Sequence, residues 1–150
     1  MTDTPTPDSE RGYTITRAYD APRQLVWRAI TEADLFARWF GSDVAFEIHS
    51  WDLREGGEWT GTMTYEGTEI PWAGRFLEVD EPKWLVVAIT DEGKVKDTDD
   101  RLSYTLVDKG DTTELIVRQW GGSLTDEQYL QAKEGSAGFL EALAKVVATL

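Results

Sequence analysis

Apolar and polar residues alternate along the chain in a pattern that changes between strand and helix periodicity. The two-residue alternation over residues 13–19 predicts a strand. Asp20 is expected to cap the helix that follows, with Pro22 in its first turn, where a missing backbone N–H leaves no hydrogen bond unmade. A second short helix is expected over residues 33–40, because Gly41 is suited to end it.

The middle of the chain is a series of apolar segments separated by turns. Six further strands are expected, over residues 44–53, 58–65, 69–79, 84–90, 101–107 and 113–120. Residues 84–90 are apolar on both parities, which is typical of a central strand covered on both faces, and residues 91–100 are expected to form a charged loop. The short connections indicate an antiparallel sheet whose apolar face must be covered by another element.

The last helix carries the clearest signals. Thr125 is its expected N-cap, and Gln128, three residues later, completes a capping box. Small and apolar residues then recur at spacings of three and four, on one face of a long helix: Tyr129, Ala132, Ser136, Leu140, Leu143, Val147 and Leu150. Gly135 and Gly138 each reduce helix propensity by about 1 kcal/mol, so packing must hold this helix in place. The pattern therefore predicts an α+β fold in which a long C-terminal helix covers the sheet.

The chain has 150 residues, no cysteine and a formal net charge of −13. This length fits one domain, which we expect at residues 13–150 after a disordered tail of residues 1–12. The tail has neither the basic nor the apolar region of a signal peptide, and no segment approaches the ~20 apolar residues of a membrane span, so we expect a cytoplasmic protein. Because the negative charge repels phosphate backbones and anionic lipid, neither nucleic acid nor membrane is expected as a partner.

A set of short motifs follows in order along the chain, at residues 15–17, 21–27, 36–41, 53–59, 74–82, 113–115 and 135–143. In this order they resemble the signatures of the bacterial activator-of-heat-shock-ATPase-homologue proteins, which belong to the START-like, or SRPBCC, superfamily. The resemblance covers residues 13–150. It implies the helix-grip fold, in which a curved antiparallel sheet of about six to seven strands, with two short helices, carries a long C-terminal helix packed across it. It also implies a cavity between the sheet and that helix.

The last helix departs from the pattern of these proteins. They usually carry a tryptophan directly after the helix glycine and often a histidine just before it, whereas this chain has Glu134, Gly135 and Ser136. The cavity wall is therefore expected to be smaller there and differently charged, and an activity that needs a helix histidine is not implied. No separate chaperone-binding domain fits before Tyr13, so a co-chaperone-like function is kept only as an alternative.

Strand parity, combined with the fold that the resemblance implies, selects a set of expected ligand contacts. They are Trp39, Phe40, Trp59, Met63, Tyr65, Trp72, Phe76, Glu78, Val87, Ile89, Tyr104, Gln119, Phe139 and Leu143. Inward glycines such as Gly61 and Gly74 are expected to leave volume beside the backbone. The alternative is that the same side chains pack as an ordinary core.

Glu78 and Gln119 are the polar members of the inward face. A buried carboxylate would have a raised pKa and could act as an acid, a base or an orienting acceptor; the alternative is that Glu78 lies at its strand end beside Asp80 and is solvated. No catalytic or metal site is predicted. His49 is the only histidine, and the aspartates at residues 97–100 lack the spacing of a calcium-binding loop.

Three functions are compatible with the sequence. The first, and the favoured one, is binding of a small apolar or aromatic ligand in the cavity, without a cofactor. The second is a cyclase- or hydratase-type enzyme, for which Glu78 and Tyr104 are the one pairing that can be named. The third is an interaction module, in which exposed tryptophans such as Trp51 and Trp84 bind a protein or form a homodimer. The sequence does not fix the ligand, because the cavity volume depends on the distance between the last helix and the sheet.

Overall fold

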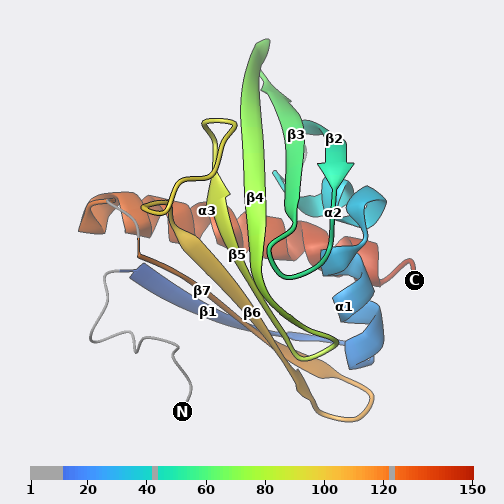
Figure 1. The fold of residues 1–150 in the computed structure, drawn as a ribbon. Coiled ribbons are helices and arrows are strands. Elements are labelled where there is room, and N and C mark those ends of the chain that lie inside the picture. Colours follow the sequence, from blue (N-terminus) through green and yellow to red (C-terminus); the bar gives the residue numbers. More distant parts are fainter. Residues whose placement is uncertain (1–11, 42–43, 122–123) are drawn as a thin grey trace.

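Within the described residues, seven strands form one antiparallel sheet and three helices accompany it (Figure 1). A computed structural model of the chain describes residues 12–41, 44–121 and 124–150. The strands are β1 (Gly12–Tyr19), β2 (Ala45–Trp51), β3 (Glu58–Tyr65), β4 (Thr68–Asp80), β5 (Trp84–Thr90), β6 (Arg101–Asp108) and β7 (Thr113–Trp120). The helices are α1 (Arg23–Thr31), α2 (Ala33–Trp39) and α3 (Asp126–Val147). The order across the sheet is β1-β7-β6-β5-β4-β3-β2, which confirms the predicted antiparallel α+β architecture.

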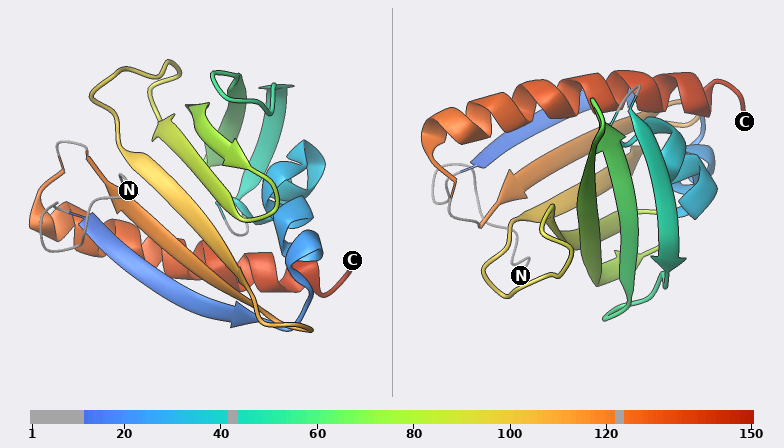
Figure 2. Two further views of the ribbon diagram at one scale, coloured as in Figure 1. Left: turned by 60° about the horizontal axis from the view of Figure 1, so that its bottom comes forward. Right: turned by 90° about the horizontal axis from the view of Figure 1, so that it is seen from above.

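Helix α3 runs across the concave face of the curved sheet (Figures 1 and 2). Its close neighbours are the edge strand β1 on one side and the helices α1 and α2 on the other. Helix α2 in turn packs on β2, the opposite edge strand. Because α3 is supported mainly at the two edges of the sheet, the fold leaves room for a cavity above the central strands.

Local sequence signals predict the start of α3 correctly and the start of α1 incorrectly. At α3 the predicted capping box is confirmed: Thr125 Oγ1 accepts from the backbone N–H of Gln128 at 3.1 Å, and Gln128 Oε1 accepts from that of Thr125 at 2.8 Å. At α1 the expectation that Asp20 is the N-cap is wrong. The helix begins at Arg23 and Pro22 is its N-cap, with an extended ψ of 154° and no side-chain cap. Proline suits this position because its ring fixes φ near the observed −63°.

Aromatic rings form the core beneath α1 and α2. The ring centroid of Phe36 lies 5.2 Å from that of Trp51 and 5.3 Å from that of Trp59. Trp51 was expected to be exposed, but it is partly buried in this core and its Nε1 donates to the carbonyl oxygen of Thr31 at 2.9 Å. Trp84 is also partly buried. The expectation of two exposed tryptophans is therefore wrong, because Trp51 packs on the core and Trp84 is partly buried, with its Nε1 bonded to Glu78.

The inward glycines of β3 and β4 make room for aromatic side chains. A Cβ at Gly74 would lie 2.1 Å from Nε1 of Trp59, and one at Gly61 would lie 2.9 Å from Cε1 of Phe46. Trp59 itself is 2% exposed. Neighbouring rings thus occupy the volume that these glycines leave. We expected this volume to contribute to the cavity, and it does not.

Gly12 already belongs to β1, and the rest of the predicted tail, residues 1–11, lies outside the described residues. None of the helices that the structure describes has the length and apolar character needed to traverse a lipid bilayer.

Candidate functional site

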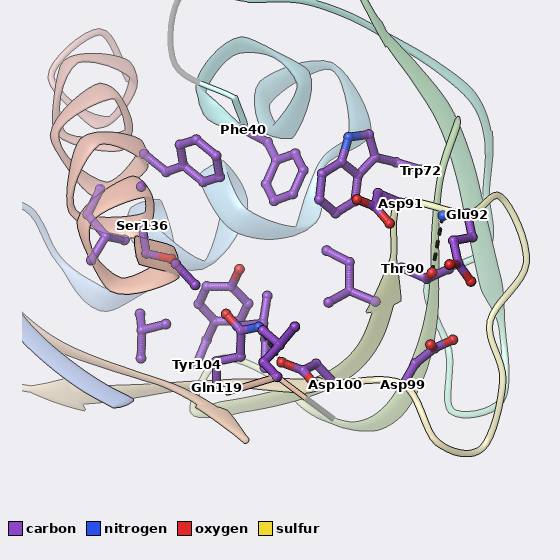
Figure 3. A pocket seen from close by; sticks show the side chains of 18 of the residues that line it. Phe40, Trp72, Thr90, Asp91, Glu92, Asp99, Asp100, Tyr104, Gln119 and Ser136 are labelled. Atoms are coloured by element: carbon purple, nitrogen blue, oxygen red, sulfur yellow. Dashed lines mark hydrogen bonds between the residues drawn. The ribbon is translucent and has the colours of Figure 1, made fainter. Parts of the chain in front are cut away.

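A cavity of about 560 Å³ lies between the concave face of the sheet and α3 (Figure 3). Its wall is contributed by the end of α2, by strands β4 to β7, by the loop of residues 91–100 and by the middle of α3. Pockets that bind small organic ligands have volumes of roughly 300–1,000 Å³, so this cavity has the size of a ligand site.

One wall of the cavity is aromatic. Phe40 is its centre, with ring centroids 5.2 Å from Trp72 and 5.1 Å from Phe139. Trp39 contributes an indole whose Nε1 donates to the carbonyl oxygen of Ala29 at 2.8 Å, so its one polar atom is satisfied within the protein. Phe40 ends α2, and the chain turns there through Gly41, whose φ of +90° favours glycine. This wall offers flat apolar surface to a ligand.

The opposite wall carries a chain of hydrogen bonds from α3 to the loop. The hydroxyl of Tyr13 lies 2.5 Å from Ser136 Oγ and donates to Gln119 Oε1 at 2.8 Å. Gln119 Nε2 donates to one carboxylate oxygen of Asp100, and the hydroxyl of Tyr129 donates to the other at 3.3 Å. Ser136, Gln119 and Asp100 all line the cavity, so one end of it is polar.

Burial changes the acidity of the groups in this chain. It raises the pKa of the Asp100 carboxyl, although the hydrogen bonds from Gln119 and Tyr129 oppose that shift. Burial also raises the pKa of Tyr13 to about 12, with the Ser136 hydrogen bond opposing it. The hydroxyl of Tyr13 therefore stays protonated at neutral pH and acts as a fixed donor and acceptor.

Two polar groups of the cavity residues have no hydrogen-bond partner among the described residues: Nε1 of Trp72 and the hydroxyl of Tyr104. The side chain of Tyr104 is 5% exposed, and its hydroxyl points into the cavity (Figure 3). No hydrogen bond from this hydroxyl is found within the part of the chain that the structure describes. Burial raises the pKa of Tyr104 well above its usual range. A buried, protonated and unpartnered hydroxyl is available to bind a polar atom of a ligand.

The cavity opens beside the loop of residues 91–100. Asp91, Glu92 and Lys96 line the opening and are exposed, while Asp99 and Asp100 are partly buried. Lys96 Nζ lies 2.6 Å from a carboxylate oxygen of Glu92 and 3.5 Å from one of Asp99. The opening is therefore dominated by carboxylates.

Half of the predicted ligand contacts lie on the cavity wall, namely Trp39, Phe40, Trp72, Ile89, Tyr104, Gln119 and Phe139. Five others are buried in the packed core instead: Trp59, Met63, Phe76, Val87 and Leu143. The last two, Tyr65 and Glu78, are exposed to solvent, Tyr65 to 52%.

A β-bulge explains the position of Glu78. Phe76 pairs with Val87, and Glu78 pairs with Val86, so one extra residue lies between them in β4. The extra residue reverses the alternation, and Glu78 turns to the convex face, where it accepts a hydrogen bond from Trp84 Nε1 at 2.6 Å. Glu78 and Tyr104 therefore lie on opposite faces of the sheet and do not form the acid–base pair that the enzyme hypothesis needs.

The sequence reading missed the carboxylates of the loop. Asp100 shares its parity with Leu102 and Tyr104, both of which face the cavity, so alternation extended by one step would have found it. The role of Asp91 and Glu92 depends on how the loop folds, for which the sequence carries no local signal.

His49 is exposed on the edge strand β2, and its Nε2 is 2.8 Å from Thr62 Oγ1. Within the described ranges, no group of three potential metal ligands is close enough to hold an ion.

Solved structures of other bacterial proteins share this fold. A protein from Nitrosomonas europaea is 25% identical, with a TM-score of 0.76 over 97% of this chain and 99% of that one. A protein from Chromobacterium violaceum is 21% identical, with a TM-score of 0.78 over 90% of this chain and 96% of that one. A protein from Arthrobacter aurescens is 19% identical, with a TM-score of 0.82 over 94% of this chain and 88% of that one.

Family comparison covers almost the whole domain. A comparison of the sequence with curated proteins found no significant match. Residues 20–148, however, match the family described as Activator of Hsp90 ATPase homolog 1-like protein. Because this match spans far more than half of the sequence and the fold agrees with it, the chain belongs to the Activator of Hsp90 ATPase homolog 1-like family of the START-like (SRPBCC) superfamily.

Proposed function

We propose that this protein binds a small ligand with an apolar or aromatic body in the cavity between the sheet and α3. The observation that carries the proposal is the cavity itself, about 560 Å³ in volume, with an aromatic wall on one side and a buried, unpartnered hydroxyl on the other. Apolar burial would supply the affinity, and a few polar groups would orient the ligand. The ligand contacts that we propose are Trp39, Phe40, Trp72, Ile89, Tyr104, Gln119 and Phe139.

Ser136 supports this proposal because of what it replaces. The family resemblance implies a tryptophan directly after the helix glycine, and here a serine with a small side chain lines the cavity at that place. Gly135, one residue before it, also lines the cavity and has no atom within 4 Å of where a Cβ would lie. Two small residues in succession keep this part of α3 from filling the space.

Because Glu78 and Tyr104 do not share a face of the sheet, we propose binding without chemistry and without a cofactor. The convex-face position of Glu78 removes the one pairing that we could name for a cyclase or hydratase. We also propose that the protein acts in the cytoplasm, since its sequence contains no cysteine from which a disulfide could form.

A thermal-unfolding screen against a varied set of small aromatic and apolar compounds tests the proposal, with circular dichroism as the readout. A ligand at one hundred times its dissociation constant adds about 2.7 kcal/mol of stability, which raises the midpoint by about 5–11 °C in a domain of this size. A flat response across the whole set would overturn the proposal.

Two tryptophan variants locate the binding site of any compound that gives a shift. Ser136→Trp places an indole inside the cavity, and Ala137→Trp places the same indole on the next residue of α3, which is exposed. We expect the first variant to lose the ligand-induced shift and the second to keep it. If Ser136→Trp does not fold, Ala132→Phe fills the cavity from the preceding turn of the helix. A shift that persists in a folded, cavity-filled variant would show that the ligand binds elsewhere.

A further inference from the structure

The charges on the cavity wall are strongly unbalanced. Among the residues that line it are four acids, Asp91, Glu92, Asp99 and Asp100, and one base, Lys96. The formal charge of this set is therefore −3, four carboxylates less one ammonium. The whole chain adds to the same field with its net charge of −13. A cavity lined by one sign of charge concentrates ligands of the opposite sign and repels those of its own.

Lys96 does not neutralise all of these carboxylates. Its ammonium is 2.6 Å from a carboxylate oxygen of Glu92 and 3.5 Å from one of Asp99, so it forms ion pairs with those two residues. Among the described residues, Asp100 accepts hydrogen bonds from two neutral groups, the amide of Gln119 and the hydroxyl of Tyr129. Within the described parts of the chain, neither Asp91 nor Asp100 forms an ion pair. Two carboxylates at the cavity thus lack a cationic partner.

One of these carboxylates, that of Asp91, adjoins the aromatic wall. Ala73 pairs with Thr90 across β4 and β5, so the next residues, Trp72 and Asp91, lie at neighbouring positions. Figure 3 shows the Asp91 carboxylate directed toward the cavity beside Trp72. An ammonium group placed there would meet a carboxylate and the face of an aromatic ring, and both attract a cation.

Tyr104 is an independent sign that the cavity takes a ligand with a polar group. Its hydroxyl points into the cavity without a partner, although its side chain is 5% exposed. A metal ion is not the expected cation, because the described residues place no three potential ligands close enough to hold one. The aromatic wall instead suits an organic body.

Resting on the proposed function, we infer that the ligand is an amine: an aromatic or apolar body with one protonated amino group, which lies against Asp91 beside Trp72 at the opening of the cavity, in the negative field to which Asp100 contributes. The apolar body packs on Phe40, Trp72 and Phe139. The Tyr104 hydroxyl bonds a second polar atom of the ligand. Carboxylic acids of the same shape are excluded by the charge of the opening.

Three compounds with one shared skeleton test this inference by titration calorimetry: 2-naphthylmethylamine, 2-naphthylmethanol and 2-naphthoic acid. We expect the amine to bind at least tenfold more tightly than the alcohol, and the acid to bind most weakly. The preference for the amine should shrink in 0.5 M salt, because ions screen charges at an exposed opening. Equal affinities of amine and alcohol, or tighter binding of the acid, would overturn the inference and leave the proposed function intact.

Variants that each remove one carboxylate charge test which residues produce the preference for the amine. Asp100→Asn and Asp91→Asn should each reduce amine affinity by threefold or more and leave alcohol affinity within twofold. Asp97→Asn removes the same charge from the same loop, but Asp97 is fully exposed and does not line the cavity, so its amine affinity should stay within twofold of the parent. An equal loss in all three variants would overturn a specific role for Asp91 and Asp100. Failure of all three compounds to bind at millimolar concentration would also overturn the inference, whereas only a flat response in the wider screen overturns ligand binding itself.

Discussion

The hydroxyl oxygen of Tyr13, on the edge strand β1, lies 2.5 Å from Oγ of Ser136, on α3. The same hydroxyl donates its hydrogen to Gln119 Oε1 at 2.8 Å, so we assign the Ser136 hydroxyl as the donor to Tyr13. This pair joins the sheet to the long helix beside the cavity. It also forms the start of the hydrogen-bond chain that ends on the Asp100 carboxylate. Ser136 is thus part of a polar wall of the cavity.

Tyr13→Phe should destabilise the domain by about 1–3 kcal/mol, because it removes two hydrogen bonds and leaves polar groups of Gln119 and Ser136 without their partner. Ser136→Ala removes only one of these bonds and should cost about 1 kcal/mol or less. Urea unfolding, followed by circular dichroism, measures both. A Tyr13→Phe variant with the same urea midpoint as the parent would show that this pair does not hold α3 on the sheet.

Two glycine-to-alanine changes should act in opposite directions. Gly74→Ala brings a Cβ to 2.1 Å from the indole nitrogen of Trp59, which is buried, so we expect a loss of about 1–3 kcal/mol or more. Gly135→Ala meets no atom within 4 Å and lies inside α3, where alanine is favoured over glycine by about 1 kcal/mol. Urea midpoints should fall in the first variant and rise in the second. Equal midpoints would contradict the tight packing of Trp59 on Gly74.

The fold could be predicted because its signals are local. The bounds of β3 and β7 follow from alternation between turn residues, and the capping box at Thr125 places the start of α3. Both kinds of signal depend on residues a few positions apart. The resemblance to a known family then supplied the arrangement of these elements.

The rest of the site could not be predicted, because the positions of its residues depend on structure that is not local in sequence. The bulge before Glu78 adds one residue to β4, and no pattern within the strand marks it. Trp59 fills the space at Gly74 from the neighbouring strand, so an inward glycine alone does not indicate a cavity. Asp91 and Glu92 reach the cavity only through the path of a charged loop.

Tyr104→Phe should weaken ligand binding without reducing the stability of the fold. The described residues give this hydroxyl no hydrogen-bond partner to lose, so we expect the unfolding free energy to stay within about 0.5 kcal/mol of the parent or to rise. Affinity should fall for ligands whose polar group reaches this hydroxyl and remain unchanged for purely apolar ones. Calorimetric titration with a matched pair of such ligands measures the difference. A loss of stability above about 1 kcal/mol would show that the hydroxyl has a structural partner.

Asp100→Asn should change how stability depends on pH. Burial raises the pKa of Asp100 in the folded protein above that of the unfolded chain. The folded state therefore binds this proton more tightly, and its contribution to stability is present at low pH and lost as pH rises through the folded pKa. An asparagine cannot ionise, and its amide can still accept from Gln119 and donate to Tyr129. The variant should thus be more stable than the parent at pH 7, and the difference should shrink as pH falls below the range in which Asp100 ionises.

Urea midpoints of this variant and its parent, measured between pH 3 and pH 8, test the prediction. Asp97→Asn controls for the loss of one negative charge from the same loop, because Asp97 is fully exposed. A gain in stability that is equal for both variants at every pH would arise from net charge alone and would contradict a buried Asp100. A gain confined to Asp100→Asn at neutral pH would mean that the protein keeps a destabilising carboxylate at the cavity. Such a cost in the empty protein is what a site for a cationic ligand requires, since the bound ammonium would then offset it.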